Sequence, residues 1–282
     1  MTQFKREVSE WHPLSVSVGS SQIFIIGDVH GQADVLEAVL AQISHTPRCC
    51  RVRQLVFLGD IIDRGPSSLK AIRLVLDARA VANVDNVVFL PGNHELMLAD
   101  GIASPMEYLP DWLDNGGDQV LEEAFPGHSA RRLEELGRMA EDAVGQNFLR
   151  VIATSHSYHQ QGDVVFVHGG LDPSQPVEAF LAKPKFGAGL GEHWAWIREP
   201  FLDWTGGWRS PTGKPCIVVH GHTPVTDAPI QLSEFTRRAD KLETHNRLCL
   251  DAGAAAVPQV AWAEMFERSY RVNLTSGEVT KR

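Results

Sequence analysis

The chain has 282 residues, 43% of them hydrophobic, four cysteines and a formal net charge of −9. The acidic balance argues against a nucleic-acid binder, which needs a basic surface to displace counterions, and the few cysteines argue against a disulfide scaffold. No uninterrupted apolar run approaches the roughly 20 residues of a membrane helix and no signal peptide is recognisable, so we expect a cytoplasmic protein with no membrane partner.

Six short apolar runs, each followed by glycine and a polar cluster, predict six strands. They are QIFIIGDVHG from Gln22, QLVFLGDIIDRG from Gln54, VVFLPGNHE from Val87, VVFVHGG from Val164, CIVVHGHT from Cys216 and LCLDAG from Leu248. Helical periodicity over residues 33–43 and after Pro66 separates the first three runs. This order predicts a βαβαβ start with parallel strands in an α/β fold.

The stretch from about residue 100 to residue 162 has helical patterns and no clear strand signal. We expect a helical insertion there, within a single domain that spans residues 1–282. The polar run 231–246 predicts a surface loop. Continuous apolar strands are typical of a sheet covered on both faces, whose ligand sites lie beyond the carboxyl ends of the strands. Folding should therefore bring the polar clusters together.

These clusters are rich in carboxylates and imidazoles, the groups that bind manganese, iron and zinc. Five of the twelve histidines lie in them, which is the strongest chemical signal in the sequence. A site for two metals needs about six such ligands, one of them a carboxylate that can bridge. The candidates are Asp28, His30, Asp60, Asn93, His168 and His222.

In this order, GDVHG, GDIIDRG, GNHE, HGG and GHT resemble the signature of the phosphoprotein-phosphatase branch of the calcineurin-like metallophosphoesterases. WIREPF, VVHGHTP and DAG resemble its bacterial members, and the resemblance runs from about Ile23 to Ala254. It implies a central β-sandwich of mixed sheets flanked by helices. It also implies a hydrolase of phosphorylated proteins or peptides at serine and threonine, with phosphotyrosine left open.

The resemblance further implies a cofactor of two divalent or trivalent metal ions, with manganese the best choice in vitro and iron or zinc compatible. One ion would be held by Asp28, His30 and Asp60. The other would be held by Asp60, Asn93, His168 and His222, so that Asp60 bridges the two ions. A hydroxide held between the metals would attack phosphorus.

Four further residues are expected to act on the substrate. By resemblance, His94 is the general acid that protonates the leaving group, and Asp63 hydrogen-bonds His94. Arg64 and Arg198 are expected to bind the phosphoryl oxygens, because a guanidinium group donates in a rigid fork that suits phosphate. Asp251 has two open interpretations, either orienting a ligand histidine or capping a turn.

Two other functions stay open. A symmetrical diadenosine tetraphosphate hydrolase shares much of the signature, but that family typically has ARGP and GNHD where this chain has DRGP at Asp63 and GNHE ending at Glu95. A non-catalytic phosphopeptide-binding module on the same fold would be expected to lack a ligand, the acid or a phosphate-binding arginine. All of these are present, which favours the phosphatase.

Overall fold

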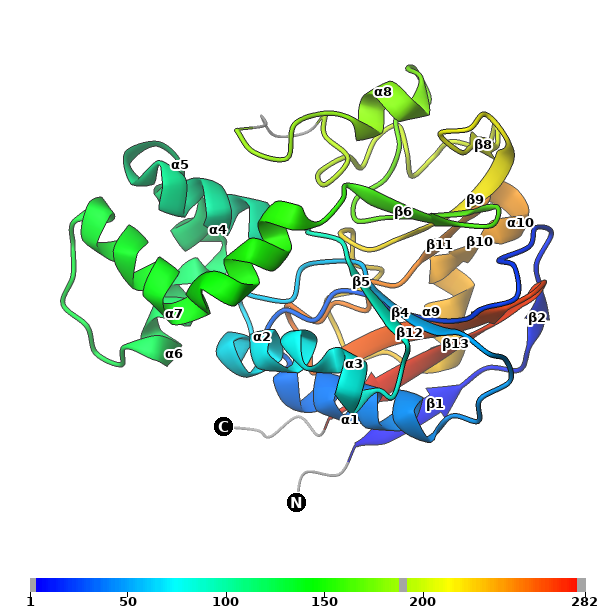
Figure 1. Ribbon diagram of the computed structural model, residues 1–282, viewed down its shortest axis with the longest axis horizontal. Helices are drawn as coiled ribbons and strands as arrows, with labels where there is room; N and C mark the ends of the chain where they lie inside the picture. The colour runs from blue at the N-terminus through cyan, green and yellow to red at the C-terminus, as the bar shows by residue number, and fades with distance from the viewer. Residues whose placement is uncertain (1–3, 188–191, 278–282) are drawn as a thin grey trace.

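Two mixed β-sheets form the centre of the computed structural model, which describes residues 4–187 and 192–277 (Figure 1). The first sheet has the order β1-β13-β12-β3-β4-β5, with β2 paired to β13. Its strands are β1 Lys5–Val8, β2 His12–Pro13, β3 Gln22–Ile26, β4 Arg53–Phe57, β5 Asn86–Phe89, β12 Gln259–Phe266 and β13 Ser269–Ser276. The predicted βαβαβ start is confirmed, since β3, β4 and β5 are parallel neighbours.

The second sheet has the order β10-β11-β9-β7-β6, with the short strand β8 paired to β9. Its strands are β6 Tyr158–Gln161, β7 Val164–Val167, β8 Trp208–Arg209, β9 Pro215–His220, β10 Asp240–Lys241 and β11 Arg247–Cys249. Within it β7, β9 and β11 are parallel. All six predicted strands are present, three in each sheet, and every polar cluster follows the carboxyl end of a parallel strand.

Alternating side chains of the strands enter different apolar layers, as the period of two residues in a strand requires. In β3, Ile23 and Ile25 face the core between the sheets, whereas Phe24 and Ile26 face the helices. In β7, Val165 belongs to a third layer on the outer face of the second sheet. The sheets are therefore packed as a sandwich and covered on both outer faces, as the continuous apolar strands predicted.

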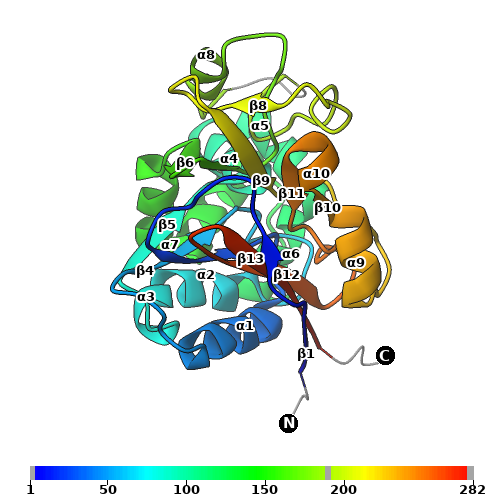
Figure 2. The ribbon, with the colours of Figure 1, turned by 90° about the vertical axis from the view of Figure 1, so that its right-hand side faces the viewer.

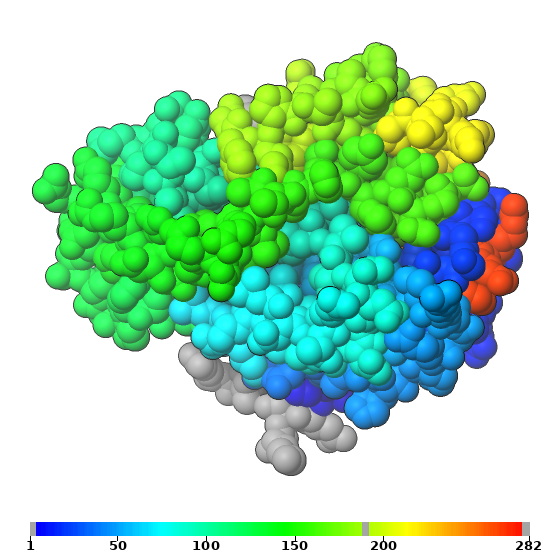
Figure 3. All heavy atoms as spheres, viewed as in Figure 1, coloured from blue at the N-terminus to red at the C-terminus, as the bar shows by residue number. Residues whose placement is uncertain are grey.

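Helices α1 Ala33–His45, α2 Ser68–Leu76 and α3 Ala78–Val81 lie along the outer face of the first sheet (Figure 1). The stretch between β5 and β6 is helical and forms the lobe at the left of Figure 3. It contains α4 Asn93–Ala103, α5 Pro105–Trp112, a π-helical turn η1 Leu113–Gly117, α6 Asp118–Ala124 and α7 Leu133–Thr154. The helices thus begin seven residues before the expected boundary at residue 100, and β6 lies where the insertion was expected to continue.

Residues 231–246 are not the loop that their polarity predicted. They form α9 Leu232–Ala239, then β10, then α10 Leu242–His245 (Figure 2). The reason is a narrow apolar stripe, because Leu232, Phe235 and Ala239 recur at helical spacing and are buried against the core between the sheets. The remaining short helix is α8 Val177–Leu181. Among the described residues, no helix is both long and apolar enough to cross a membrane.

Candidate metal centre and active site

The polar clusters meet at one edge of the sandwich, as the parallel strands predicted. Backbone hydrogen bonds tie the loops together: the amides of Val29 and His30 donate to the Asp60 carbonyl, each over 2.9 Å. The Gly221 amide donates to the His168 carbonyl over the same distance. Loops that lie far apart in the sequence thus present their side chains to a common centre.

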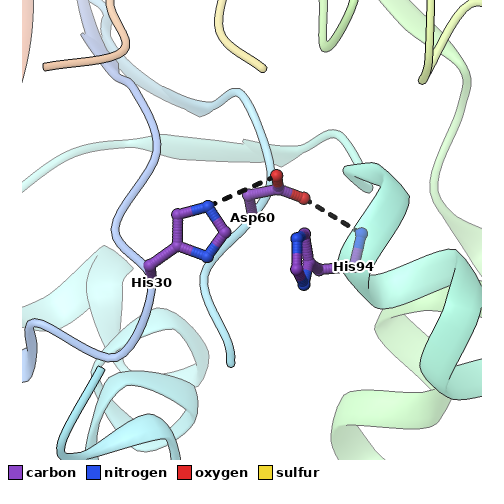
Figure 4. A group of neighbouring side chains, drawn as sticks. All are labelled: His30, Asp60 and His94. Carbon is purple, nitrogen blue, oxygen red and sulfur yellow. Dashed lines mark hydrogen bonds and ion pairs between the residues drawn. The ribbon is translucent and has the colours of Figure 1, made fainter. Parts of the chain in front are cut away.

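Asp60 is the residue shared by the two halves of this centre. Its Oδ2 atom lies 3.6 Å from His30 Nε2 and 3.3 Å from His168 Nε2, while Oδ1 accepts the His94 amide at 3.1 Å (Figure 4). Its carboxylate belongs both to a buried group with His30 and His94 and to a second buried group with His168 and His222. Each group has ligand atoms close enough together to hold one metal ion.

Asn93 completes the second group. Its Oδ1 atom lies 3.0 Å from His168 Nε2 and 2.9 Å from His222 Nδ1. An amide oxygen accepts a hydrogen bond from an imidazole nitrogen only if that nitrogen carries a proton. An amide oxygen is also a common metal ligand. Asp60, Asn93, His168 and His222 therefore converge as the sequence predicted.

The histidine tautomers favour metal binding. A backbone carbonyl accepts from His30 Nδ1 (Ile62 O, 3.1 Å), from His168 Nδ1 (Leu58 O, 2.8 Å) and from His222 Nε2 (Trp196 O, 3.0 Å). Since a carbonyl cannot donate, each of these nitrogens carries the proton, and in the neutral ring the opposite nitrogen has a free lone pair. That nitrogen faces Asp60 or Asn93 in every case. This arrangement is the usual one for histidines that hold a metal.

Asp28 lies beside the second group rather than inside either one. Its carboxylate accepts the His222 amide, at 3.2 Å from Oδ1 and 3.0 Å from Oδ2. A Cβ atom on Gly221 would lie 2.0 Å from Asp28 Oδ1, so only glycine allows this approach. The sequence predicted that Asp28 binds a metal ion together with His30 and Asp60. In the structure Asp28 lies near the same loops, but its carboxylate oxygens face the backbone amide of His222.

The buried carboxyl groups suit a site for cations. Burial, then the charges of Asp251 and Asp60, raise the pKa of Asp28 well above its ordinary value. Burial and the charge of Asp60 likewise raise the pKa of Asp251 to about 6. Burial acts in the same direction on Asp60, but the neighbouring His168 and His94 rings outweigh it and lower the pKa of Asp60. Positive ions at this position would compensate the cluster of acids.

His94 and Asp63 form a buried pair beside the first group. His94 Nδ1 lies 2.7 Å from Asp63 Oδ2, and both side chains are almost fully buried. The His94 ring packs edge-on against His30 with 4.7 Å between centroids. Its other nitrogen, Nε2, has no hydrogen-bond partner within residues 4–187 and 192–277, so it is free to hold a proton for a ligand.

The two arginines expected to contact phosphate are both exposed. Arg64 is held by the π-helical turn: its amide donates to Gly116 O at 3.3 Å and its Nε to Asn115 O at 3.2 Å. Burial, then the charges of His168 and Arg198, lower the pKa of His222. Arg198 lies two residues along the chain from Trp196, whose carbonyl accepts from His222 Nε2 at 3.0 Å.

His220 and Asp251 have other contacts. His220 Nε2 lies 3.3 Å from Arg247 Nη1, and its ring packs edge-on against Phe201 with 4.8 Å between centroids, so it faces away from Asp60. Asp251 Oδ1 accepts the Gly253 amide at 2.9 Å, which is the capping interpretation of this residue. Of the tryptophans near Arg198, Trp196 packs edge-on against His222 at 6.2 Å.

The site contains an unusual concentration of left-handed backbone. Eight non-glycine residues within the described parts of the chain have positive φ, and five of them carry candidate site side chains: His30, Asp60, Asp63, Arg64 and His222. Such a conformation costs of order 1–3 kcal/mol for a residue with a Cβ atom. The sharp turns aim these side chains at the centre at the expense of local backbone stability.

Glu95 is a structural residue that the sequence did not reveal. Its Oε2 accepts the amides of Asp60 and Gly92, and its Oε1 accepts the amide of Ile61, each at 2.8 Å. The side chain is fully buried and joins the loop of Asp60 to the loop that begins α4. In the sequence Glu95 is only the last residue of the GNHE motif.

We expect Glu95→Gln to lower the free energy of unfolding by about 1.5–3 kcal/mol, because one carboxylate oxygen that accepts from the backbone becomes an amide NH₂ group that faces an N–H. Urea denaturation followed by circular dichroism measures this difference. Glu122→Gln is the matched control, since exposed Glu122 accepts only the Gly127 amide, and a change within about 0.5 kcal/mol is expected for it. Equal stability of the two variants would contradict the role given to Glu95.

The sandwich, the convergent histidines and the buried carboxylates define a metal-dependent phosphohydrolase. A sequence model described as calcineurin-like phosphoesterase matches residues 21–257, and the chain belongs to this family. It is similar to bis(5'-nucleosyl)-tetraphosphatase PrpE [asymmetrical] of Bacillus subtilis, with 29% identity over 214 residues, covering 72% of this chain and 79% of the relative.

The chain also resembles serine/threonine-protein phosphatase 2 of Escherichia coli, at 34% identity over 96 residues, 34% of this chain and 38% of the relative. Among solved structures, a putative diadenosine tetraphosphatase superposes with a TM-score of 0.52 at 16% identity, covering 93% of this chain and 96% of that one. At this identity the structural likeness shows the fold alone. The predicted metallophosphoesterase fold is confirmed.

Proposed function

We propose that this chain hydrolyses phosphate monoesters of proteins or peptides, at phosphoserine and phosphothreonine and with phosphotyrosine as a further substrate. The observation that carries this proposal is the buried His94–Asp63 pair. Loss of an alkoxide from phosphoserine needs a proton donor, because an alkoxide is a strong base. Cleavage of a polyphosphate chain expels a phosphate group that is stable as an anion, so a dedicated acid contributes less there.

The site residues would either bind the metal ions or bind the phosphoryl group. Asp28, His30 and Asp60 would hold one metal ion, and Asp60, Asn93, His168 and His222 the other; manganese, iron and zinc all suit this donor set. When bound, such ions lower the pKa of water and stabilise charge on the phosphoryl group. Arg64 and Arg198 would donate to the phosphoryl oxygens, and both are exposed where a phosphorylated segment can reach them.

Side chains of the protein would carry out the proton transfer. Asp63 accepts from His94 Nδ1–H, so the proton for the leaving group would be the second proton of a His94 imidazolium, on Nε2, which does not face the carboxylate. His94 would give this proton to the leaving oxygen, and Asp63 would stabilise the positive imidazolium before the transfer. We also propose that helices and sheets form one domain, since Trp112 and Phe148 of the helical stretch share an apolar core with Phe57 of β4.

A second candidate is hydrolysis of dinucleoside tetraphosphates. It is favoured by one observation: two relatives named bis(5'-nucleosyl)-tetraphosphatase PrpE [asymmetrical] align over 214 residues, whereas those named as protein phosphatases align over 96 and one named as the symmetrical tetraphosphatase aligns over 76. The longer similarity covers regions outside the metal-binding loops. Those regions shape substrate choice more than the metal cage does.

A manganese-supplemented assay with a phosphoserine peptide, para-nitrophenyl phosphate and diadenosine tetraphosphate separates the candidates. The proposal predicts that the peptide has the highest kcat/KM and that a chelator abolishes all turnover. A higher kcat/KM for the dinucleotide would move the assignment to the second candidate. Absence of turnover of all three with added manganese, iron or zinc would instead favour a non-catalytic phosphopeptide-binding protein.

A further inference from the structure

We propose that Trp112 is a positioning residue for the acid pair, donating its indole N–H to Asp63 and thereby fixing the carboxylate against His94. The inference rests on the proposed function, because it assumes that His94 is the proton donor. Trp112 ends helix α5 in the helical stretch, 49 residues from Asp63 in the chain. A residue outside the two sheets would thus keep the acid pair in position.

The geometry of the contact restrains the carboxylate. Trp112 Nε1 lies 3.1 Å from Asp63 Oδ1 and 3.0 Å from Oδ2, so one N–H donates to both oxygens. His94 Nδ1 approaches Oδ2 from its own side at 2.7 Å. Within the described residues, these two donors are the only hydrogen-bond partners of the Asp63 carboxylate. Removal of the indole N–H would leave a fully buried carboxylate with a single partner and freedom to rotate.

Trp112 itself is held in place. Its side chain has no exposed surface, and the ring lies against Gly117, where a Cβ atom would meet the ring at 2.3 Å. The indole N–H therefore has no route to solvent, and Asp63 is its acceptor. Burial raises the pKa of Asp63, and the Trp112 hydrogen bond opposes that effect, which favours the charged carboxylate that a histidine acid needs.

The same turn also holds the neighbouring arginine. Three and four residues after Trp112, the carbonyls of Asn115 and Gly116 accept from Arg64. Gly116 has φ of 103°, and a Cβ atom there would lie 2.7 Å from Arg64 Cγ. Asp63 and Arg64 are thus both positioned by residues 112–116. The NGG sequence of residues 115–117 is thus, like Trp112, a part of the helical stretch that reaches the centre.

The test is Trp112→Phe, which keeps an aromatic ring and removes the N–H. The substrates are phenyl, para-nitrophenyl and 2,4-dinitrophenyl phosphate, whose leaving groups become progressively less basic. We expect kcat for phenyl phosphate to fall on the order of 10-fold, the effect of one lost hydrogen bond to a charged group, with KM nearly unchanged. For 2,4-dinitrophenyl phosphate, which needs little protonation, we expect nearly no loss.

Trp262→Phe is the matched control. Trp262 is also fully buried and donates its indole N–H to Thr275 Oγ1 at 3.2 Å, but it lies in β12 and its ring packs against Phe24 and Arg6. We expect it to lose comparable thermal stability and to keep the wild-type dependence on leaving group. If Trp112→Phe lowers kcat equally for all three esters, or for none, Trp112 has only a structural role and the inference fails.

Two additional measurements keep the result interpretable. If Trp112→Phe does not fold, the indole N–H resonances of the seven tryptophans report the contact in the wild-type background. One of them should shift in Asp63→Asn, and no shift would overturn the inference. His94→Asn on the same esters tests the proposed function separately. If its loss of kcat is the same for all three esters, the acid role of His94 fails. If the loss depends on the leaving group in His94→Asn but not in Trp112→Phe, only the role of Trp112 is rejected.

Discussion

His94→Asn should lower kcat for a phosphoserine peptide by about 10²–10⁴-fold, the usual contribution of a general acid. Asparagine is close to histidine in size and polarity near the backbone, but it cannot carry a transferable proton at neutral pH. The loss should shrink for 2,4-dinitrophenyl phosphate, because its leaving group departs as a stable anion. Steady-state kinetics with the peptide and the aryl ester measures both quantities in one preparation.

The control for this variant is His220→Asn. His220 is equally buried and is the last residue of β9, but it contacts Phe201 and Arg247 instead of Asp63. It should lose stability while keeping the wild-type ratio of peptide to aryl ester turnover. An unchanged ratio in His94→Asn would mean that the leaving group obtains its proton elsewhere.

Asp60→Asn is expected to have an effect on the order of 10³-fold or more on kcat/KM, because loss of several kcal/mol of metal electrostatics corresponds to about three powers of ten. The change removes a negative charge 3.6 Å from His30 Nε2 and 3.3 Å from His168 Nε2, so both halves of the centre lose a ligand atom. Metal content per chain after dialysis, measured by atomic emission, should fall together with activity.

Asp172→Asn provides the comparison. Asp172 follows β7 four residues after His168, but its carboxylate accepts from Ser174 and Gln175 rather than facing the centre. This variant should retain metal and turnover. Wild-type metal content and activity in Asp60→Asn would exclude a shared, bridging role for Asp60.

Much of the centre was predictable because its residues belong to short motifs at strand ends. Asp28, Asp60 and His168 each follow an apolar strand within three residues, and parallel strands bring their carboxyl ends to one edge. The pairing of His94 with Asp63 was predicted from the family resemblance, and the structure places the two side chains in contact. Motifs of this kind can be recognised in the sequence because each one contains its own glycine and its own ligand residue.

The supporting contacts were not predictable for a physical reason. Glu95 and Trp112 act across 34 and 49 residues of sequence, and neither has a local pattern that distinguishes a buried acceptor or donor from an ordinary helical side chain. Glu95 even lies in a motif whose neighbours are candidate ligands. Helix α9 was missed because its five polar or charged residues conceal a stripe of three apolar residues, and burial of that stripe decides the conformation.

The left-handed backbone at His30, Asp60, Asp63, Arg64 and His222 also bears on how this chain can evolve. Glycine adopts that conformation without a steric penalty, so replacement at these positions relieves strain while it removes a reactive side chain. A lineage released from selection for turnover would therefore gain stability by losing its ligands one at a time. Descendants that keep the fold as inert binding proteins should be more heat-resistant than their active ancestors.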